Sequence, residues 1–426
     1  MARVVTARAG GAPAPAPPGR FRLPARASGL LAPDERAAAF GFVRALLEPP
    51  TAPYAEDAQV DVVRAFVAAR AGFSLEEDAH ANLVVTWRGA RAAGARARPV
   101  LAYSAHLDHP GFLYAGTAKG RHRAVFHGGV PERYFAGAPV RFFDVDTRAP
   151  LATATVARVE RVPLAGDSGG DELVATLRGF RGTARAGMFG AWDLAPGELR
   201  GRRLHARVCD DLLGAAAILC TLDRLARARH PAPAIGVFTR AEETGFVGCQ
   251  GLLRDATLGA DVALVGLECS PRRATAKVGQ GPVIRVGDRQ SVFDPAITHH
   301  LQEAAETLRA RHPAFRVQRA LMDGGSCEST AYNLWGVRAG ALCLALGNYH
   351  NCGPDGRIAP EFVDWDDFEG LVVLMTEAAT SWSEGTGAQA KMRARLDRVW
   401  QREYNRLASS ARRIRAGSRP RNASRE

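Results

Sequence analysis

The sequence lacks any long hydrophobic run. No apolar stretch approaches the roughly 20 residues of a membrane-spanning helix, so we expect no membrane partner. The first residues are rich in alanine, proline and arginine but hold no continuous apolar segment, and we therefore expect no cleaved secretory signal. The seven cysteines include no CxxC pair, which favours reduced and mostly buried thiols. Together these absences predict a cytoplasmic protein.

Acidic residues are absent from residues 1–33 and scarce in residues 386–426. These two tails carry net charges of +5 and +9, whereas the whole chain carries +12. Residues 34–385 therefore sum to −2, and this nearly neutral body does not indicate a nucleic-acid-binding fold. We expect residues 1–33 to be a disordered tail rich in alanine, proline and arginine. We expect residues 386–426 to be a basic tail, part helical and part disordered, that is solvated or contacts another subunit.

The 426 residues are 46% hydrophobic and 23% charged, which is ordinary for a globular protein with two or three domains. Helical and strand patterns alternate over residues 34–108 and again over residues 204–385. Residues 109–203 instead hold short alternating runs separated by glycine and proline turns. We therefore predict an α/β fold with a doubly wound mixed sheet, built from the two outer segments and interrupted by a small inserted all-β domain.

Two adjacent carboxylates, Glu242 and Glu243, follow the apolar run at residues 234–239, which is typical of a buried strand. Carboxylates at the end of a buried strand are costly unless a cation lies nearby. A metal site would explain both residues, with one glutamate as a ligand and its neighbour as a general base. Taken alone, however, such a pair more often opens a solvated loop.

Further histidines and carboxylates lie at the ends of predicted strands or at the start of a helix. In a doubly wound sheet the carboxyl ends of the strands share one edge, so these side chains are expected to converge. Two histidines and several carboxylates suit two divalent ions bridged by a carboxylate. Each residue alone could instead be a structural histidine or a helix cap. The candidates are His106, Asp108, Asp210, Asp211, Glu268 and His350.

Several segments resemble the cocatalytic dizinc aminopeptidases, and in particular the tetrahedral-aminopeptidase or glutamyl-aminopeptidase family, once also named endoglucanases. The resemblance covers roughly residues 36–383, with the motifs in the family order. It implies a phosphorylase/hydrolase-like zinc exopeptidase fold, whose inserted β domain lines the pocket and mediates dimerisation. The segments that carry it are HLDHPGF, CDDLLG, AEETGFVGCQG, KVGQGPVIRVGDR, GGSCEST and GNYHN.

The resemblance also implies a ligand set for two divalent ions. Asp210 would bridge the two ions. His106 and Glu268 would complete one site, and Glu243 and His350 the other. Zinc is the expected metal, with cobalt and manganese as alternatives. The family further implies a peptide substrate and a homo-oligomer, either a dimer or a dodecamer.

Two further residues take catalytic roles by the same resemblance. Asp108 would orient His106 through its second ring nitrogen. Glu242 would take a proton from the bridging water and deliver it to the leaving amine. The implied function is a metallo-exopeptidase that hydrolyses N-terminal residues from peptides.

Departures from the family pattern leave the preferred substrate residue open. Glu268 stands where aspartate is common, Leu212 replaces the usual arginine, and GGSCEST lacks the family aspartate. No role is assigned to Glu328 or to Cys209 and Cys269. Two alternatives stay open: a dimetal carboxypeptidase, deacetylase or N-acyl-amino-acid hydrolase of the same clan, and a catalytically degenerate scaffold that acts as a basic-tailed binding protein. The complete set of ligands and base argues against the second.

Overall fold

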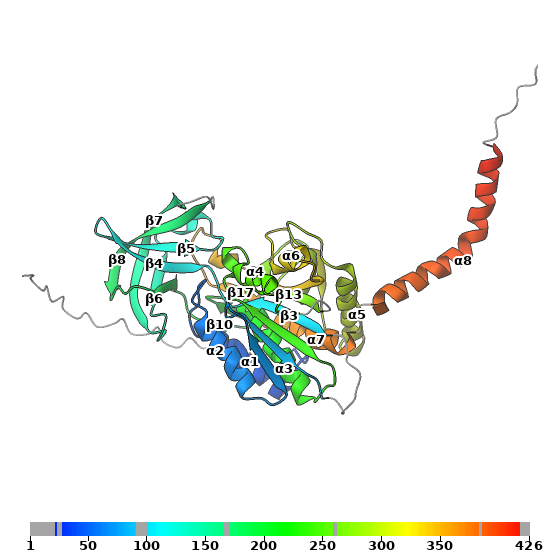
Figure 1. The fold of residues 1–426 in the computed structure, drawn as a ribbon, viewed down its shortest axis with the longest axis horizontal. Helices are drawn as coiled ribbons and strands as arrows, with labels where there is room; N and C mark the ends of the chain where they lie inside the picture. The colour runs from blue at the N-terminus through cyan, green and yellow to red at the C-terminus, as the bar shows by residue number, and fades with distance from the viewer. Residues whose placement is uncertain are drawn as a thin grey trace, which may run out of the picture.

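The protein consists of an α/β body, a β barrel beside it, and a last helix that extends away from both (Figure 1). This computed structural model describes residues 22–23, 28–90, 100–164, 170–258, 262–382 and 386–417. Residues 1–21, the greater part of the predicted first tail, lie outside the described residues, as do residues 418–426. Within the described parts of the chain, no helix is long and apolar enough to cross a bilayer.

The body is organised around one mixed sheet of eight strands. Its four central strands, β12, β3, β13 and β16, run parallel, and the strands at both edges include antiparallel pairs. The central strands are apolar along nearly their whole length because helices cover both faces. In spatial order the strands are β1 (Phe73–Glu77), β2 (Leu83–Trp87), β12 (Ala234–Thr239), β3 (Leu101–His106), β13 (Ala263–Pro271), β16 (Ala339–Leu346), β14 (Val283–Gly287) and β15 (Gln318–Leu321).

Helices pack on both faces of this sheet, which confirms the predicted fold class. On one face α3 (Leu212–Arg227) lies against β3, with α1 (Pro33–Leu47) and α7 (Trp365–Ser381) packed against it. On the other face α4 (Val247–Arg254) and α6 (Glu328–Leu334) contact each other, and α6 also contacts β13 and β16. The remaining helices of the body are α2 (Asp57–Ala68), which contacts α1 and β1, and α5 (Pro295–Arg311), which contacts α7 and β14.

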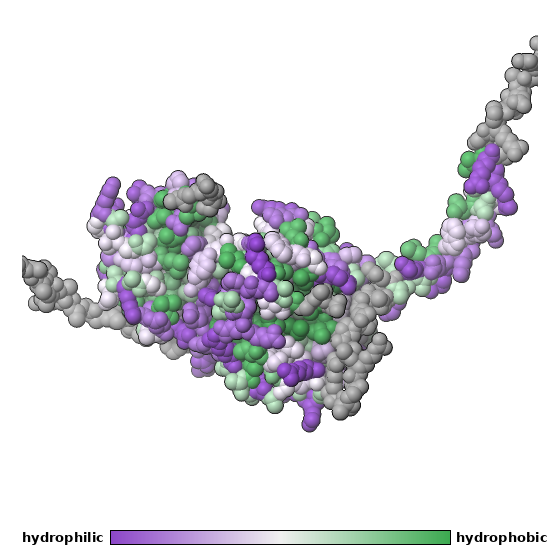
Figure 2. Space-filling view, in the orientation of Figure 1, coloured by the Kyte–Doolittle hydropathy of each residue, from purple (hydrophilic) through white to green (hydrophobic). Residues whose placement is uncertain are grey.

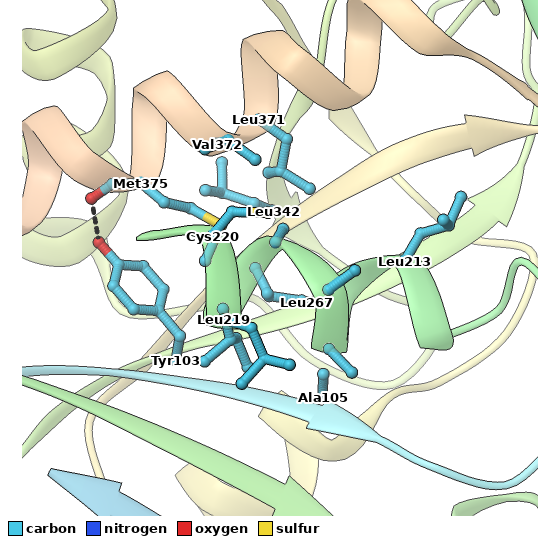
Figure 3. Packing of buried hydrophobic residues seen from close by; sticks show 14 of the residues in the cluster. Tyr103, Ala105, Leu213, Leu219, Cys220, Leu267, Leu342, Leu371, Val372 and Met375 are labelled. Carbon is cyan, nitrogen blue, oxygen red and sulfur yellow. Dashed lines mark hydrogen bonds between the residues drawn. The ribbon is translucent and has the colours of Figure 1, made fainter. Parts of the chain in front are cut away.

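The main core lies between the sheet and α3 and α7 (Figure 3). Leu219 of α3 and Leu371 of α7 are fully or almost fully buried there. Tyr103 of β3 points into the same layer, and its hydroxyl donates a hydrogen bond to the Met375 carbonyl at 2.6 Å. Helix α3 is buried along most of its length, so this layer holds the helix that begins beside the candidate site.

The inserted segment contains a closed six-stranded barrel with its own apolar interior. Phe112, Phe126, Phe135 and Trp192 fill this interior, and most of their ring pairs meet edge to face. The strands are β4 (Gly111–Ala118), β5 (Arg121–His127), β8 (Asp171–Gly182), β7 (Pro150–Pro163), β6 (Pro139–Phe143) and β9 (Phe189–Trp192), in spatial order.

A small three-stranded sheet follows the barrel. It is formed by β10 (Gly197–Arg200), β11 (Arg203–Ala206) and β17 (Glu361–Asp364). Strand β10 pairs with β11, which in turn pairs with the late strand β17, so β10 belongs to this sheet rather than to the barrel, although the proposed insertion extends to residue 203. The division of the chain into domains at residues 109–203 stays a prediction.

Two local expectations differ from the structure. Strand β13 continues to Pro271, so Glu268 lies inside the strand instead of following it, because the strand keeps pairing with β16 beyond its apolar part. His300 lies among polar residues of a predicted helix, which favours a solvent-facing side chain. It is instead buried, since its Nε2 atom lies 2.8 Å from the Ala378 carbonyl and its ring packs on Trp382. Periodicity alone does not reveal either long-range contact.

Substitution of Leu219 by alanine tests the packing of α3. Because Leu219 is fully buried, Leu219→Ala is expected to lower the free energy of unfolding by about 3 kcal/mol, measured by urea denaturation. Leu396→Ala, the same change at a helical residue that is 63% exposed, is expected to change it by less than about 0.5 kcal/mol. Equal effects of the two substitutions would contradict this description of the core.

Candidate metal centre

The candidate residues meet at the carboxyl ends of the four central parallel strands. His106 is the last residue of β3, and Glu268 lies near the end of β13. Glu242 and Glu243 begin the short 3-10 helix η2 (Glu242–Thr244) after β12. His350 lies in the 3-10 helix η3 (Tyr349–Asn351) after β16. The topology therefore brings together residues that lie up to 244 positions apart in the sequence.

Asp210 lies between the two histidines. Its Oδ1 atom is 3.7 Å from His106 Nε2, and its Oδ2 atom is 3.7 Å from His350 Nε2. Both separations exceed a hydrogen bond. Two ligands of one tetrahedral zinc ion lie about 3.4 Å apart when each is about 2.1 Å from the metal. The two pairs therefore have roughly the spacing of ligands that share an ion.

Two groups of three potential ligands form around this carboxylate. One ligand atom each of His106, Glu242 and Glu268 lies within 4.8 Å of the others in its group, and the same holds for Asp210, Glu243 and His350. His350 Nε2 is 3.1 Å from Glu243 Oε1, yet this oxygen accepts no hydrogen bond. The two atoms are close enough for a hydrogen bond, but they are not oriented to form one. This arrangement is expected when both atoms face the position of one shared ion.

Asp108 fixes the turn that carries the two glutamates. Its Oδ1 atom accepts a hydrogen bond from the Glu242 backbone N–H at 2.9 Å, and its Oδ2 atom accepts one from the Glu243 N–H at 3.0 Å. His106 Nδ1 lies 3.4 Å from Asp108 Oδ1 but makes no hydrogen bond. Asp108 therefore lies where the predicted contact with His106 is possible, and in addition it holds Glu242 and Glu243 in place.

Glu361, which the sequence analysis did not select, supports both Asp210 and His350. It is fully buried at the start of β17. Its Oε2 atom accepts hydrogen bonds from the backbone N–H groups of Cys209 (2.6 Å) and Asp210 (3.2 Å), and its Oε1 atom accepts one from the His350 N–H (2.9 Å). The only signal in the sequence is an acidic residue at the start of a short apolar segment.

Asp211 takes the capping role that the sequence left open. It is the N-cap of α3 and accepts a hydrogen bond from the Gly214 N–H at 3.2 Å. A Cβ atom on Gly214 would lie only 2.3 Å from an Asp211 carboxylate oxygen, so this close approach requires glycine. The spacing of the motif CDDLLG is thus explained by a helix cap next to a candidate ligand.

Two further contacts orient the ligands. His109 Nδ1 lies 2.9 Å from the Asp210 carbonyl, and His109 Nε2 lies 3.0 Å from Asn351 Oδ1. On the other side of the site, His350 Nδ1 lies 3.0 Å from the Gly129 carbonyl, which follows barrel strand β5. A carbonyl accepts but cannot donate, so a hydrogen bond here places a proton on Nδ1 and leaves Nε2 free to bind a metal.

Backbone strain is concentrated in the loops that carry the ligands. Ala241, Asn348, His350 and Asn351 all have positive φ values, between 49° and 61°. Such conformations cost about 1–3 kcal/mol each for residues other than glycine and persist where the surroundings enforce them. The Ala241 N–H, for example, donates to the buried Glu56 carboxylate at 2.9 Å. The strain is therefore held by specific hydrogen bonds at the edge of the site.

The charges at the site are strongly coupled. Burial raises the pKa of Glu268, and the Asp210 and Glu242 carboxylates raise it further. Burial also raises the pKa of Glu242. Burial opposes the ionisation of Asp210, but the His106 and His350 rings hold its pKa well below its ordinary value. A divalent cation would favour the ionised form of every carboxylate here, and the donor set therefore fits such an ion.

Two other residues, Cys269 and Glu328, lie close to the cluster. Cys269 could join Asp210 and Asp211 as a third group of potential ligands, but its Sγ atom lies 3.4 Å from the Cys209 carbonyl and burial raises the pKa of its thiol. Glu328 is buried, and Ser104 donates a hydrogen bond to it at 3.2 Å. Burial raises the pKa of Glu328 to about 7.

A narrow pocket opens beside Glu268. Arg285 lies in its wall and is almost fully buried, and Tyr349 lies in the wall next to His350. The pocket is lined by Glu268, Ser270, Arg273, Arg285, Met322 and Tyr349, among other residues.

Solved structures of aminopeptidases share this fold. Aminopeptidase APDkam598 from the archaeon Desulfurococcus kamchatkensis matches 82% of this chain and 96% of its own, with a TM-score of 0.65 and 18% identity. The TET1 peptidase of Pyrococcus horikoshii matches 81% of this chain and 100% of its own, with a TM-score of 0.62 and 19% identity. The fold is therefore that of the aminopeptidases to which the sequence motifs point.

A family model matches part of the sequence. Residues 183–357 match the model of the M42 glutamyl aminopeptidases, the family that the sequence motifs resemble. A protein named "Putative aminopeptidase" from Acetivibrio thermocellus is 24% identical over 184 residues, which is 42% of this chain and 52% of the relative. The match thus spans about half the length of that curated relative.

Replacement of Glu361 by glutamine tests its supporting role. The glutamine side chain has only one oxygen atom. Its NH₂ group would therefore face the backbone N–H of either Asp210 or His350, where no hydrogen bond can form. We expect Glu361→Gln to weaken Zn²⁺ binding by about 10- to 100-fold, measured by calorimetry on the metal-depleted protein. Glu76→Gln, at an exposed position in β1, is the matched control and should bind like the wild type. Wild-type affinity of Glu361→Gln would contradict the role.

Proposed function

We propose that this protein is a metal-dependent aminopeptidase that removes N-terminal residues from peptides. The observation that carries the proposal is the position of Asp210, whose two carboxylate oxygens each face the Nε2 atom of a different histidine at 3.7 Å. A carboxylate between two histidines suits a bridge between two neighbouring divalent ions. The match of residues 183–357 to the model of the M42 glutamyl aminopeptidases supports a peptide substrate.

In this proposal His106 and Glu268 hold one ion, Glu243 and His350 hold the other, and Asp210 bridges them. The two groups of potential ligands support the division, since Glu268 groups with His106 and Glu243 with His350. Zinc is the expected metal, because its usual ligands include both imidazole and carboxylate, and cobalt and manganese are the alternatives to test. When bound, such ions supply Lewis acidity to a peptide carbonyl and lower the pKa of water.

Glu242 moves the protons in this proposal. Its carboxylate lies beside His106 and Glu268, and its backbone N–H is held by Asp108 at 2.9 Å. A carboxylate oxygen of Glu242 takes a proton from the attacking water, and the same proton is later donated to the nitrogen of the leaving amine. Asp108 is a positioning residue. Its carboxylate accepts hydrogen bonds from the backbone N–H groups of both the base Glu242 and the neighbouring ligand Glu243.

In this proposal the substrate's first side chain extends into the pocket beside Glu268. We also propose a homo-oligomer, with a dimer as the smallest unit and a dodecamer as the larger assembly. The TET1 peptidase of Pyrococcus horikoshii, which shares the fold, is described as assembling into a tetrahedron or a large octahedral shell. The cytoplasmic location stays a prediction.

The two adjacent glutamates provide a matched pair for a test. Glu242→Gln is expected to keep metal binding and to lower kcat by about 100-fold or more, because an amide cannot accept the proton. Glu243→Gln is expected to lose metal from its site, because a charged ligand is replaced by a neutral one. Metal content by mass spectrometry and hydrolysis of aminoacyl-anilides separate the two. If both variants retain metal and activity, the division of roles is wrong.

Metal removal and a blocked substrate test the reaction itself. Chelation should abolish hydrolysis of the aminoacyl-anilide, and added Zn²⁺ or Co²⁺ should restore it. An N-acetylated version of the same substrate should be cleaved on the order of 100-fold more slowly, because an exopeptidase of this class recognises the free α-amine. Preferential cleavage of the blocked substrate would instead indicate an N-acyl-amino-acid hydrolase or deacetylase, and metal-independent hydrolysis would overturn the proposal.

A further inference from the structure

Helix α8 (Thr386–Gly417) leaves the body of the protein and extends away from it (Figure 1). Its beginning contacts α5, where Lys391 Nζ lies 2.9 Å from Glu303 Oε1. Beyond this contact the helix carries large apolar side chains that are 40–65% exposed. The helices of the body bury most of their large apolar side chains against the sheet or one another. Packing on the body therefore does not explain the apolar side chains of α8.

The apolar side chains of α8 form one stripe. They recur every three or four residues, which places them on the same side of a helix with 3.6 residues per turn. Hydrophobic patches are visible along the projecting helix in Figure 2. The stripe includes two aromatic residues with a polar atom, a kind of side chain enriched where an apolar medium meets water. Its members are Met392, Leu396, Val399, Trp400, Tyr404 and Leu407.

The opposite side of α8 is strongly basic. Residues 386–417 hold nine lysines and arginines against two acids, Asp397 and Glu403, for a net charge of +7. Arg398 and Arg402 lie on the side away from the centre of the stripe, and Arg406, seven residues after Val399, lies beside the stripe. Their side chains are 69% exposed at Arg402 and 84% at Arg406, although both of these residues contact Glu403. The helix therefore combines an exposed apolar stripe with a dense positive charge.

We propose that α8 is a membrane-surface anchor that lies in the plane of an anionic lipid bilayer, with its apolar stripe among the acyl chains and its arginines at the headgroups. Helices that lie at a membrane surface combine two features: a polar face rich in basic residues and an apolar face that includes aromatic residues. Helix α8 has both features. The proposal goes beyond the proposed function and adds a peripheral contact that the sequence analysis did not expect. It requires no membrane-spanning segment.

Other partners fit the observations less well. A nucleic acid would neutralise the arginines but would leave the apolar stripe in water. A second copy of α8 could cover the stripe but would bring two helices of net charge +7 together. An anionic lipid bilayer can bind the basic residues through its headgroups and bury the apolar stripe among its acyl chains. Each basic residue near such a surface strengthens binding.

Co-sedimentation of the full-length protein with lipid vesicles tests the proposal. We expect binding to vesicles of equal parts phosphatidylglycerol and phosphatidylcholine, and at least about tenfold weaker binding to phosphatidylcholine alone. Substituting three arginines together (Arg398→Gln, Arg402→Gln and Arg406→Gln) should weaken binding to the anionic vesicles on the order of 100-fold. The matched control changes the same charge at exposed arginines of the body and barrel: Arg88→Gln, Arg121→Gln and Arg178→Gln. It should bind nearly as tightly as the wild type.

A second set of variants tests the apolar stripe. Leu396→Gln together with Trp400→Gln keeps the charge and the helix propensity and should weaken binding about tenfold or more. Tryptophan emission should shift to shorter wavelength on the anionic vesicles, and Trp400→Phe should bind but lose this shift. Circular dichroism and the unfolding midpoint of each variant exclude loss of folding as the cause.

Several results would overturn the proposal. One is equal binding to neutral and anionic vesicles, and another is binding that is unchanged in the stripe variant. Binding to duplex DNA that requires the arginines but not the stripe, without vesicle binding, would assign α8 to nucleic acid. Loss of an oligomer in the stripe variant, measured by sedimentation velocity and again without vesicle binding, would assign the stripe to a second copy of the chain.

Discussion

The repulsion among buried carboxylates is the constraint on which the site depends. Asp210, Glu242, Glu243 and Glu268 lie at one edge of the sheet, within a few ångströms of one another, and all are largely buried. Like charges in such surroundings destabilise the folded protein unless protons, histidines or cations offset them. The two histidines offset part of the charge, as the lowered pKa of Asp210 indicates. Packing does not explain a cluster of this kind, because apolar residues would fill the same space at lower free-energy cost.

Buried carboxylates outside the cluster fix the positions of the loops that carry the candidate ligands. Asp108, Glu361 and Glu56 are fully buried, and each accepts backbone hydrogen bonds from a loop that carries candidate ligands. Glu56 also contacts Arg240 at 2.9 Å, and burial raises its pKa to about 7. These groups hold the loops in left-handed backbone conformations that the loops would not adopt alone. The rigidity of the site therefore comes from acids that do not themselves group with the ligands.

The sequence predicted those parts of the molecule that local patterns determine. An apolar run followed by a histidine or acid locates His106, Glu242 and His350, because the strand and its polar end are neighbours in the chain. Glu361 could not be found in this way, since its role depends on the pairing of β17 with β11, which lie far apart in the sequence. The burial of His300 likewise depends on α7.

The contact between the Gly129 carbonyl and His350 couples the barrel to the body thermodynamically. If the barrel moved away, His350 would lose the acceptor that sets its tautomer, and binding of a cation at Nε2 would become less favourable. Coupling of this kind is reciprocal, so an occupied site would in turn favour the docked position of the barrel by the same free energy. A peptide or a neighbouring subunit that touches only the barrel would then alter metal affinity without reaching the site, and loss of metal would loosen whatever assembly the barrel supports.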